Sequence, residues 1–289
     1  MPRVPAPLLA VAAIFSVQFG SAFARTHFDE IGPTGAATLR LVFAAVILVA
    51  VVRPRVGNWT RRQWLAAGVL GLALAGMNSL IYLAVARIPL GVAVTLEFTG
   101  PLVLALVQTR RLRDLLWALV AFAGVILLGL GSTTGVAVGG VLLAFGAAAF
   151  WAGYILASSR VGRETPGIDG LVVAIVVAAV VVTPFGAADA VSSIRADPWL
   201  IGVFAIVAVL TSALPYALEL IALRSLPTRV FGVLSSLGPA VAALAGLVVI
   251  GQLLDLREVI ALVLVTAASV GVTISRSRDA VVVPVTPGD

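Results

Sequence analysis

The sequence has no cysteine, no lysine and a single histidine, His27, among its 289 residues. The absence of cysteine excludes disulfide bonds, thiolate metal sites and cysteine nucleophiles. Charged residues make up only 11% of the chain, against about 25% in an average soluble domain. With 61% hydrophobic residues, a soluble fold would lack enough polar surface to cover itself. The composition therefore predicts an all-α integral membrane protein whose surroundings are the lipid bilayer.

The net charge of +6 does not indicate a nucleic-acid partner. All 19 basic residues are arginines, and they lie in short joints between apolar runs. Proteins that bind phosphate backbones gather their basic residues on one solvated face instead. We therefore expect no nucleic acid among the partners of this chain.

Ten apolar segments with short joints account for almost the whole chain, since a membrane-spanning helix needs ~20 mostly apolar residues. The sequence therefore predicts ten transmembrane helices. The predicted crossings are residues 7–26, 34–53, 64–86, 89–108, 114–131, 138–159, 169–187, 199–222, 228–249 and 256–275. The remaining residues, 277–289, are rich in proline and too few to span, so we expect a mobile tail there.

The arginines are distributed unequally between the two ends of these crossings. Fourteen fall on the side that carries both termini, four fall on the other side, and Arg40 lies within a crossing. Short cytoplasmic loops retain arginine. Both termini are therefore predicted to be cytoplasmic, and so is the tail.

The first 24 residues allow a second interpretation. They have a basic start, an apolar centre and the small-x-small ending Ala22-Phe23-Ala24, as a cleaved signal peptide does. Removing them would destroy the internal repeat described next, so we favour a first membrane crossing.

Two stretches 138 residues apart share their glycine and proline positions. Residues 88–102 and 226–240 align Pro89 with Pro227, Gly100 with Gly238, and Pro101 with Pro239. The chain is thus predicted to contain two five-helix repeats, 1–133 and 134–276. Because five is odd, the second repeat enters the membrane from the opposite side, and inverted repeats are typical of secondary transporters. A duplicated structural bundle without transport is the alternative.

Glu97 is the only charged residue between residues 91 and 108. It lies 8 residues after Pro89, about 12 Å along a helix and close to the middle of a ~30 Å hydrocarbon layer. Pro101 has no amide hydrogen to donate to the carbonyl of Glu97, and Pro239 has the same relation to Ser235. Two helices broken in this way, facing each other, would form a polar chamber. The predicted helix-break positions are Gly100, Pro101, Gly238 and Pro239.

Other polar and aromatic residues of the crossings are candidates for the lining of this chamber. Arg40 lies about 9 Å into its helix, at a depth that would allow an ion pair with Glu97. The other candidates are Gln18, Asn78, Tyr82, Trp151, Tyr154, Tyr216, Ser235 and Ser236. Each has a structural alternative, namely a buried pair for Glu97 and Arg40, packing for the aromatic residues, and interhelical hydrogen bonds for Asn78 and the serines.

Residues 76–102 and 211–240 resemble the threonine and homoserine exporters of the drug/metabolite transporter superfamily, whose members carry two EamA-type repeats. The resemblance covers nearly the whole chain. It implies a bacterial inner-membrane protein that exports small amino acids and is driven by protons. Two positions depart from the pattern, because similar exporters commonly have Glu-Pro in place of Gly238-Pro239 and Gly-Glu in place of Gly251-Gln252.

Our hypothesis is therefore an exporter that works by alternating access and exchanges a proton at Glu97 for a small amino-acid substrate. Another small metabolite, such as a different amino acid or a purine-like compound, is the alternative cargo. An intramembrane enzyme is disfavoured, because the sequence offers no nucleophile–base pair and no set of metal ligands. We accordingly expect no cofactor and no metal. A channel without a coupling ion is a further alternative, and the sequence does not indicate an oligomeric state.

Overall fold

In the computed structural model, every regular element of the described residues is a helix. The structure describes residues 5–107, 112–129, 137–165, 167–215, 218 and 234–279. The α-helices are α1 (Ala6–Arg25), α2 (Phe28–Val52), α3 (Arg61–Val85), α4 (Leu90–Glu97), α5 (Thr99–Val107), α6 (Leu112–Gly129), α7 (Val138–Glu164), α8 (Asp169–Ala196), α9 (Leu200–Ala208), α12 (Gly238–Ala245) and α13 (Leu256–Asp279). Two π-helical stretches, η2 (Val209–Ala213) and η3 (Gly246–Ile250), continue α9 and α12.

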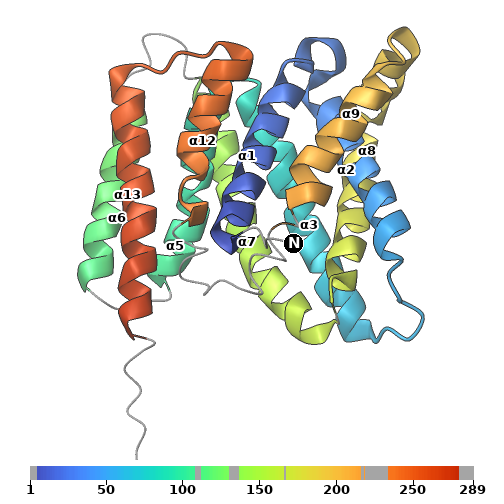
Figure 1. Ribbon diagram of the computed structural model, residues 1–289, viewed down its shortest axis with the longest axis horizontal. Coiled ribbons are helices and arrows are strands. Elements are labelled where there is room, and N and C mark those ends of the chain that lie inside the picture. Colours follow the sequence, from blue (N-terminus) through green and yellow to red (C-terminus); the bar gives the residue numbers. More distant parts are fainter. Residues whose placement is uncertain are drawn as a thin grey trace, which may run out of the picture.

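The helices run up and down in one bundle, with α6 and α13 together at one edge and α2 and α8 together at the other (Figure 1). The joint between α2 and α3 and the C-terminal ends of α7 and α13 lie at the lower side of Figure 1. The joints that follow α1, α8 and η3 lie at the upper side. Arginine-rich joints and arginine-poor joints of the described chain therefore lie on opposite sides of the bundle.

Five described helices are long and apolar enough to cross a membrane, namely α1, α2, α3, α7 and α8. Shorter apolar helices cover three further predicted crossings. Large apolar side chains on the outside of the bundle are more than half exposed, as expected for a surface that faces lipid tails. Examples are Phe122, Leu142, Val180, Phe185 and Val248.

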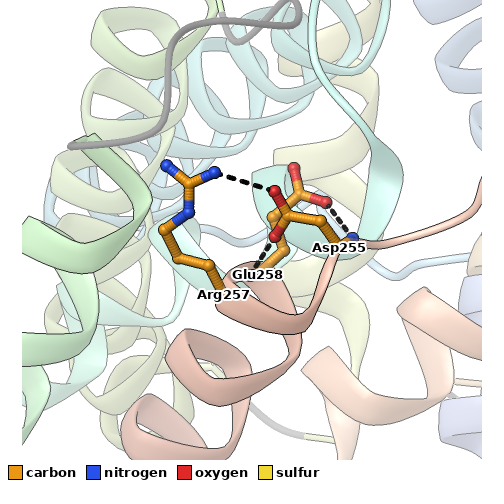
Figure 2. A network of polar contacts seen from close by, with 3 residues as sticks. All are labelled: Asp255, Arg257 and Glu258. Carbon is orange, nitrogen blue, oxygen red and sulfur yellow. Dashed lines mark hydrogen bonds and ion pairs between the residues drawn. The ribbon is translucent and has the colours of Figure 1, made fainter.

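Reciprocal side-chain caps fix the starts of two helices. The Thr60 hydroxyl accepts the Gln63 amide at 3.4 Å, and the Gln63 side chain accepts the Thr60 amide at 2.8 Å, before α3. Asp255 and Glu258 exchange the same two bonds at 2.7 and 2.9 Å before α13, where Arg257 pairs with Asp255 at 3.1 Å (Figure 2). The bond from the Glu258 amide is the main cause that holds the pKa of Asp255 below its usual range. These caps satisfy amide groups that a helix start leaves without partners.

Several helices are longer than the sequence predicts, α2 and α8 among them. The helix predicted at 34–53 is preceded by a turn from Phe28, and Gly32 joins the two with φ +71°, a left-handed conformation open to glycine. The helix predicted at 169–187 was placed too short, because α8 continues to Ala196. Asp189 accepts a hydrogen bond from Thr34 at 2.8 Å and Ser193 donates to the Glu30 carbonyl at 2.8 Å, so the additional turns are held against α2.

Small residues let the helices approach closely, as is common where lipid supplies no hydrophobic driving force. A Cβ on Gly71 of α3 would lie 2.6 Å from Val177 of α8, and one on Gly91 of α4 would lie 2.8 Å from Ala243 of α12. The core around these contacts is rich in buried alanine, including Ala22 and several others with no exposed surface. The central helices therefore pack backbone against backbone, and a cavity remains where larger polar residues replace the small ones.

Candidate functional site

A cavity of about 460 Å³ lies among α1, α2, α3, α4 and α7 and the residues around the ends of η2 and α12. Pockets of this size are typical for small metabolites. Its polar and aromatic lining comes from segments far apart in the sequence. These residues are Gln18, Ser21, Phe28, Arg40, Asn78, Tyr82, Glu97, Phe98, Trp151, Tyr154, Thr211 and Ser235.

Glu97 is the last residue of α4, and the helix is interrupted at Phe98 before α5 begins at Thr99. The Thr99 hydroxyl donates to the Leu96 carbonyl at 2.6 Å, so this side chain bonds to the backbone of the preceding helical turn, next to the interruption. Pro101 cannot donate to the Glu97 carbonyl. The carboxylate of Glu97 is partly exposed because it faces the cavity. Side chain and free carbonyl thus present two acceptors at one place.

A second interruption, at Ser236 and Leu237, precedes α12, which starts at Gly238 and Pro239. This interruption meets the first one directly, since a Cβ on Gly238 would lie 2.6 Å from the Phe98 ring. The Phe98 ring also stands edge-on to Trp151, with 4.7 Å between ring centroids and an angle of 89°. Phe98 therefore fills the space between the two breaks.

Gly100 allows α5 to approach α7. A Cβ at this position would collide with the backbone carbonyl of Ala148. No side chain other than hydrogen fits there without moving a helix backbone. Gly100 thus keeps the Glu97 break pressed against the helix that carries Trp151 and Tyr154.

Arg40 is 8% exposed and does not form the ion pair with Glu97 that the sequence suggested. Among the described residues no carboxylate lies within ion-pair distance of it; its Nη2 donates to the Thr211 carbonyl at 3.3 Å. Its guanidinium carbon also lies 5.3 Å from the centre of the Tyr82 ring, within the range of a cation–π interaction. Both residues line the cavity, so Arg40 still supplies a positive charge to the space that Glu97 makes negative.

The acceptor for Arg40 arises from another proline. Pro215 lies four residues after Thr211 and has no amide hydrogen to donate to the Thr211 carbonyl. The Thr211 hydroxyl turns back to the Val207 carbonyl at 2.7 Å within the π-helical stretch η2. Stretches of π-helix are frequent at functional sites. Thr211, Arg40 and Pro215 all line the cavity.

Asn78 and Tyr82 lie one turn apart on α3 and face the cavity together, as the sequence predicts. Asn78 is 3% exposed, and its amide group donates to the Leu74 carbonyl at 2.8 Å. Tyr82 packs against Phe28, with 5.5 Å between ring centroids. Gln18 reaches the cavity from α1.

The structure brings nine of the predicted site residues to the cavity wall, namely Gln18, Arg40, Asn78, Tyr82, Glu97, Trp151, Tyr154, Ser235 and Gly238. Ser236 is buried beside it without lining it, and Gly100, Pro101 and Pro239 shape the two breaks from behind. Tyr216 lies outside the described residues.

Sequence reasoning missed Phe98, Thr211 and Pro215 among the lining residues. A signal for Thr211 was present: a polar residue four positions before a proline, the spacing that also relates Glu97 to Pro101 and Ser235 to Pro239. No such signal marked Phe98, because its ring occupies space that is open only while residue 238 is a glycine.

A bundle of apolar helices around a cavity with a few polar groups, and with helices broken at the cavity wall, is the architecture of a membrane transporter. Comparison with known proteins agrees. Residues 138–274 match the model of the EamA-like transporter family. The chain belongs to this family.

Curated relatives match over nearly the whole chain. Threonine/homoserine exporter RhtA of Salmonella typhimurium strain LT2 is 41% identical over 275 residues, which cover 94% of this chain and 92% of that protein. Threonine/homoserine exporter RhtA of Escherichia coli strain K12 is 39% identical over 277 residues, with the same shares covered. A solved crystal structure of a protein shares the fold, with a TM-score of 0.58 and 22% identity over 94% of this chain and 98% of that chain.

Proposed function

We propose that this protein exports small amino acids of the threonine and homoserine type across the bacterial inner membrane, in exchange for protons. The observation that carries the proposal is the position of Glu97, a carboxylate at a helix break that faces a cavity also lined by Arg40. Acidic and basic groups in one enclosed site suit the two charges of an amino acid. The relatives that match 94% of the chain are threonine/homoserine exporters, which supports this cargo.

Alternating access requires two halves that can exchange conformations. We propose that residues 1–133 and 134–276 are these halves, each with five membrane crossings of opposite orientation. The family match, at 138–274, covers almost the same range as the second half. Packing supports the relation too, because α2 contacts α8 and α6 contacts α13, and each pair joins equivalent helices of the two halves.

Other helix–helix contacts are also preserved when each helix is replaced by its equivalent in the other half. α3 packs against α7 and α8, and the equivalent helices α9 and η2 pack against α1 and α2. α5 packs against α7, and its equivalent α12 packs against α1. A set of neighbours that is unchanged when the halves are exchanged is what a two-fold axis between them produces, and an odd number of crossings in each half places that axis in the membrane plane. We place both termini in the cytoplasm, because the arginine-rich joints lie on their side of the bundle.

The mechanism we propose makes a proton and the substrate ammonium group alternatives at Glu97. An ionised carboxylate in a membrane interior is costly unless a cation accompanies it. When the cavity faces the cytoplasm, the ammonium group of the substrate supplies that cation. When it faces outward, a proton replaces the substrate, and the neutral side chain can return through the closed state.

The test is transport in membrane vesicles whose cytoplasmic face points outward. An acidic interior should drive accumulation of L-threonine and L-homoserine inside these vesicles, and a proton uncoupler should abolish it. Vesicles without the protein provide the background. If no amino acid accumulates, the cargo is wrong; if accumulation withstands the uncoupler, proton exchange is wrong.

A flat heterocyclic metabolite is a second candidate cargo, favoured by one observation. Phe98 and Trp151 place an aromatic corner in the cavity wall, against which a purine-like ring could stack. Thermal stabilisation of the purified protein across a panel of amino acids and purines separates the two cargoes. Stabilisation by adenine or hypoxanthine and not by threonine would favour the purine class.

A further inference from the structure

Two buried hydrogen-bond donors at the cavity wall have no partner within the described part of the chain. They are the Nε of Arg40 and the hydroxyl of Tyr82, on side chains that are 8% and 3% exposed. An unpaired buried donor is costly, more so when it carries charge, and such groups call for an explanation. Both residues line the cavity, so a small shift of either side chain would bring these donors to a ligand bound there.

The guanidinium of Arg40 is held at Nη2 and is unpaired at Nε. Its Nη2 is tied to the Thr211 carbonyl at 3.3 Å, and its carbon lies 5.3 Å from the Tyr82 ring centre. These two contacts fix its position before any ligand arrives. The arginine side chain presents Nε–H in a fork geometry that matches the two oxygens of a carboxylate. The Tyr82 hydroxyl offers a further donor from the neighbouring helix.

Two other polar residues of the cavity are less suited to this task. The Asn78 amide group is already engaged with the Leu74 carbonyl at 2.8 Å. Glu97 has the wrong charge for an anion and suits an ammonium group instead. We propose that Arg40 and Tyr82 form a carboxylate-binding subsite, so that the cavity selects molecules with a free carboxylate. The inference deepens the proposed function, and rests on it for the identity of the whole substrate.

Three probes that differ in one group each test the subsite: L-threonine, L-threoninamide, which lacks the carboxylate, and 3-hydroxybutyrate, which lacks the amine. Thermal stabilisation of the purified protein gives the half-saturating concentration of each. We expect Tyr82→Phe and Arg40→Lys each to raise this concentration about 10-fold or more for the two carboxylates. The value for threoninamide should stay unchanged, so the preference for threonine over its amide should shrink by the same factor.

Matched controls come from the same chain. Ser158→Ala removes another unpartnered buried hydroxyl, and Arg25→Lys alters another arginine that bonds a carbonyl, Val85 at 3.0 Å, and lies over an aromatic ring. Neither Ser158 nor Arg25 lines the cavity, and neither variant should change any of the three concentrations.

The outcomes separate this inference from the proposed function. If the parent binds threonine and the Tyr82 and Arg40 variants keep its preference over the amide, the subsite is wrong and the function stands. An equal loss for threonine and its amide would show a structural role and also overturn the subsite. If 3-hydroxybutyrate binds in an Arg40-dependent way but no amino acid binds, the subsite stands and the proposed cargo is wrong.

Discussion

The two helix breaks of this protein have glycine and proline at the same positions and differ in the side chains around them. Each has a polar residue four positions before a proline, Glu97 before Pro101 and Ser235 before Pro239, and both polar residues line the same cavity. Only the first carries a charge. The second has Gly238 where the Phe98 ring of the first break needs room. Both breaks thus have a polar residue four positions before a proline, whereas a carboxylate and a large aromatic ring are present at the first break alone.

The largest effect should come from removing the charge that distinguishes the breaks. Glu97→Gln keeps the size of the side chain and removes its titration, so proton-driven export should fall by at least ~10-fold, since ionisable groups in membrane interiors are functional as a rule. Ser235→Ala, the matched change at the second break, should lose only a few-fold at most. Both are measured as threonine accumulation in vesicles with and without a pH gradient. Equal rates and equal gradient dependence for Glu97→Gln and the parent would refute the coupling role.

The next largest difference between the two breaks should appear in the stability of variants in which the glycine of each break is replaced. Gly100→Ala places a methyl group against the backbone carbonyl of Ala148, which cannot move alone, and should cost about 3 kcal/mol. Gly238→Ala meets the end of the Phe98 ring at 2.6 Å and should cost about 1 kcal/mol. Thermal unfolding in detergent measures both.

Two further variants control this comparison. Phe98→Leu in the Gly238→Ala background should restore part of the lost stability, because the ring that opposes the methyl group is gone. Gly153→Ala, on α7 with nothing within 4 Å of the new methyl group, should be neutral or stabilising. A larger loss for Gly238→Ala than for Gly100→Ala would invert the comparison.

A smaller effect is expected at the N-terminal end of the first broken helix. The Gln252 side chain, which follows η3, accepts the Leu90 amide at 2.9 Å and so caps α4. Gln252→Ala should lower stability by about 1 kcal/mol, as loss of a cap does. Gln252→Glu keeps the acceptor and adds a negative charge at a helix N-terminus, so it should be at least as stable as the parent. A Glu variant less stable than the Ala variant would contradict the cap.

The smallest effect serves as a reference away from both breaks. Asp255→Ala removes the exposed cap of α13, where the Glu258 amide holds the pKa of Asp255 below its usual range. A carboxylate with a lowered folded pKa stabilises the protein above its unfolded pKa, and this contribution is lost as the pH falls through the folded value. The melting temperature of the variant should therefore be slightly low at pH 7 and equal to that of the parent in strong acid. Transport should be unchanged; a transport defect would place α13 in the mechanism.

Much of the fold could be predicted from the sequence, because its causes are local. Long apolar runs require helices that satisfy their own backbone, and the described helices lie where those runs are. Prolines mark where a carbonyl loses its donor, and the interruption at Phe98 follows from Pro101. The end of α8 was predicted too early, because contacts of its last turns with α2 depend on residues more than 150 positions away.

The cavity was predictable in outline and not in its contacts. The depth of Glu97, Arg40 and Tyr82 follows from helical rise, so their shared location could be anticipated. The sequence alone suggested that Arg40 would pair with Glu97, whereas the folded chain gives it the Thr211 carbonyl. A long flexible side chain can reach several partners at one depth, and the choice depends on how each helix is rotated about its axis.

The sequence by itself determined the lipid surroundings, the helices and the two proline breaks. Each of these is a property of a short stretch of chain in lipid. Only the tertiary structure decided which residues meet: Phe98 against Gly238, Gln252 on the start of α4, and Arg40 beside Tyr82 at the cavity wall. The physical reason is that these contacts arise from the close packing of helices far apart in the sequence, and no local pattern encodes how one helix is turned toward another.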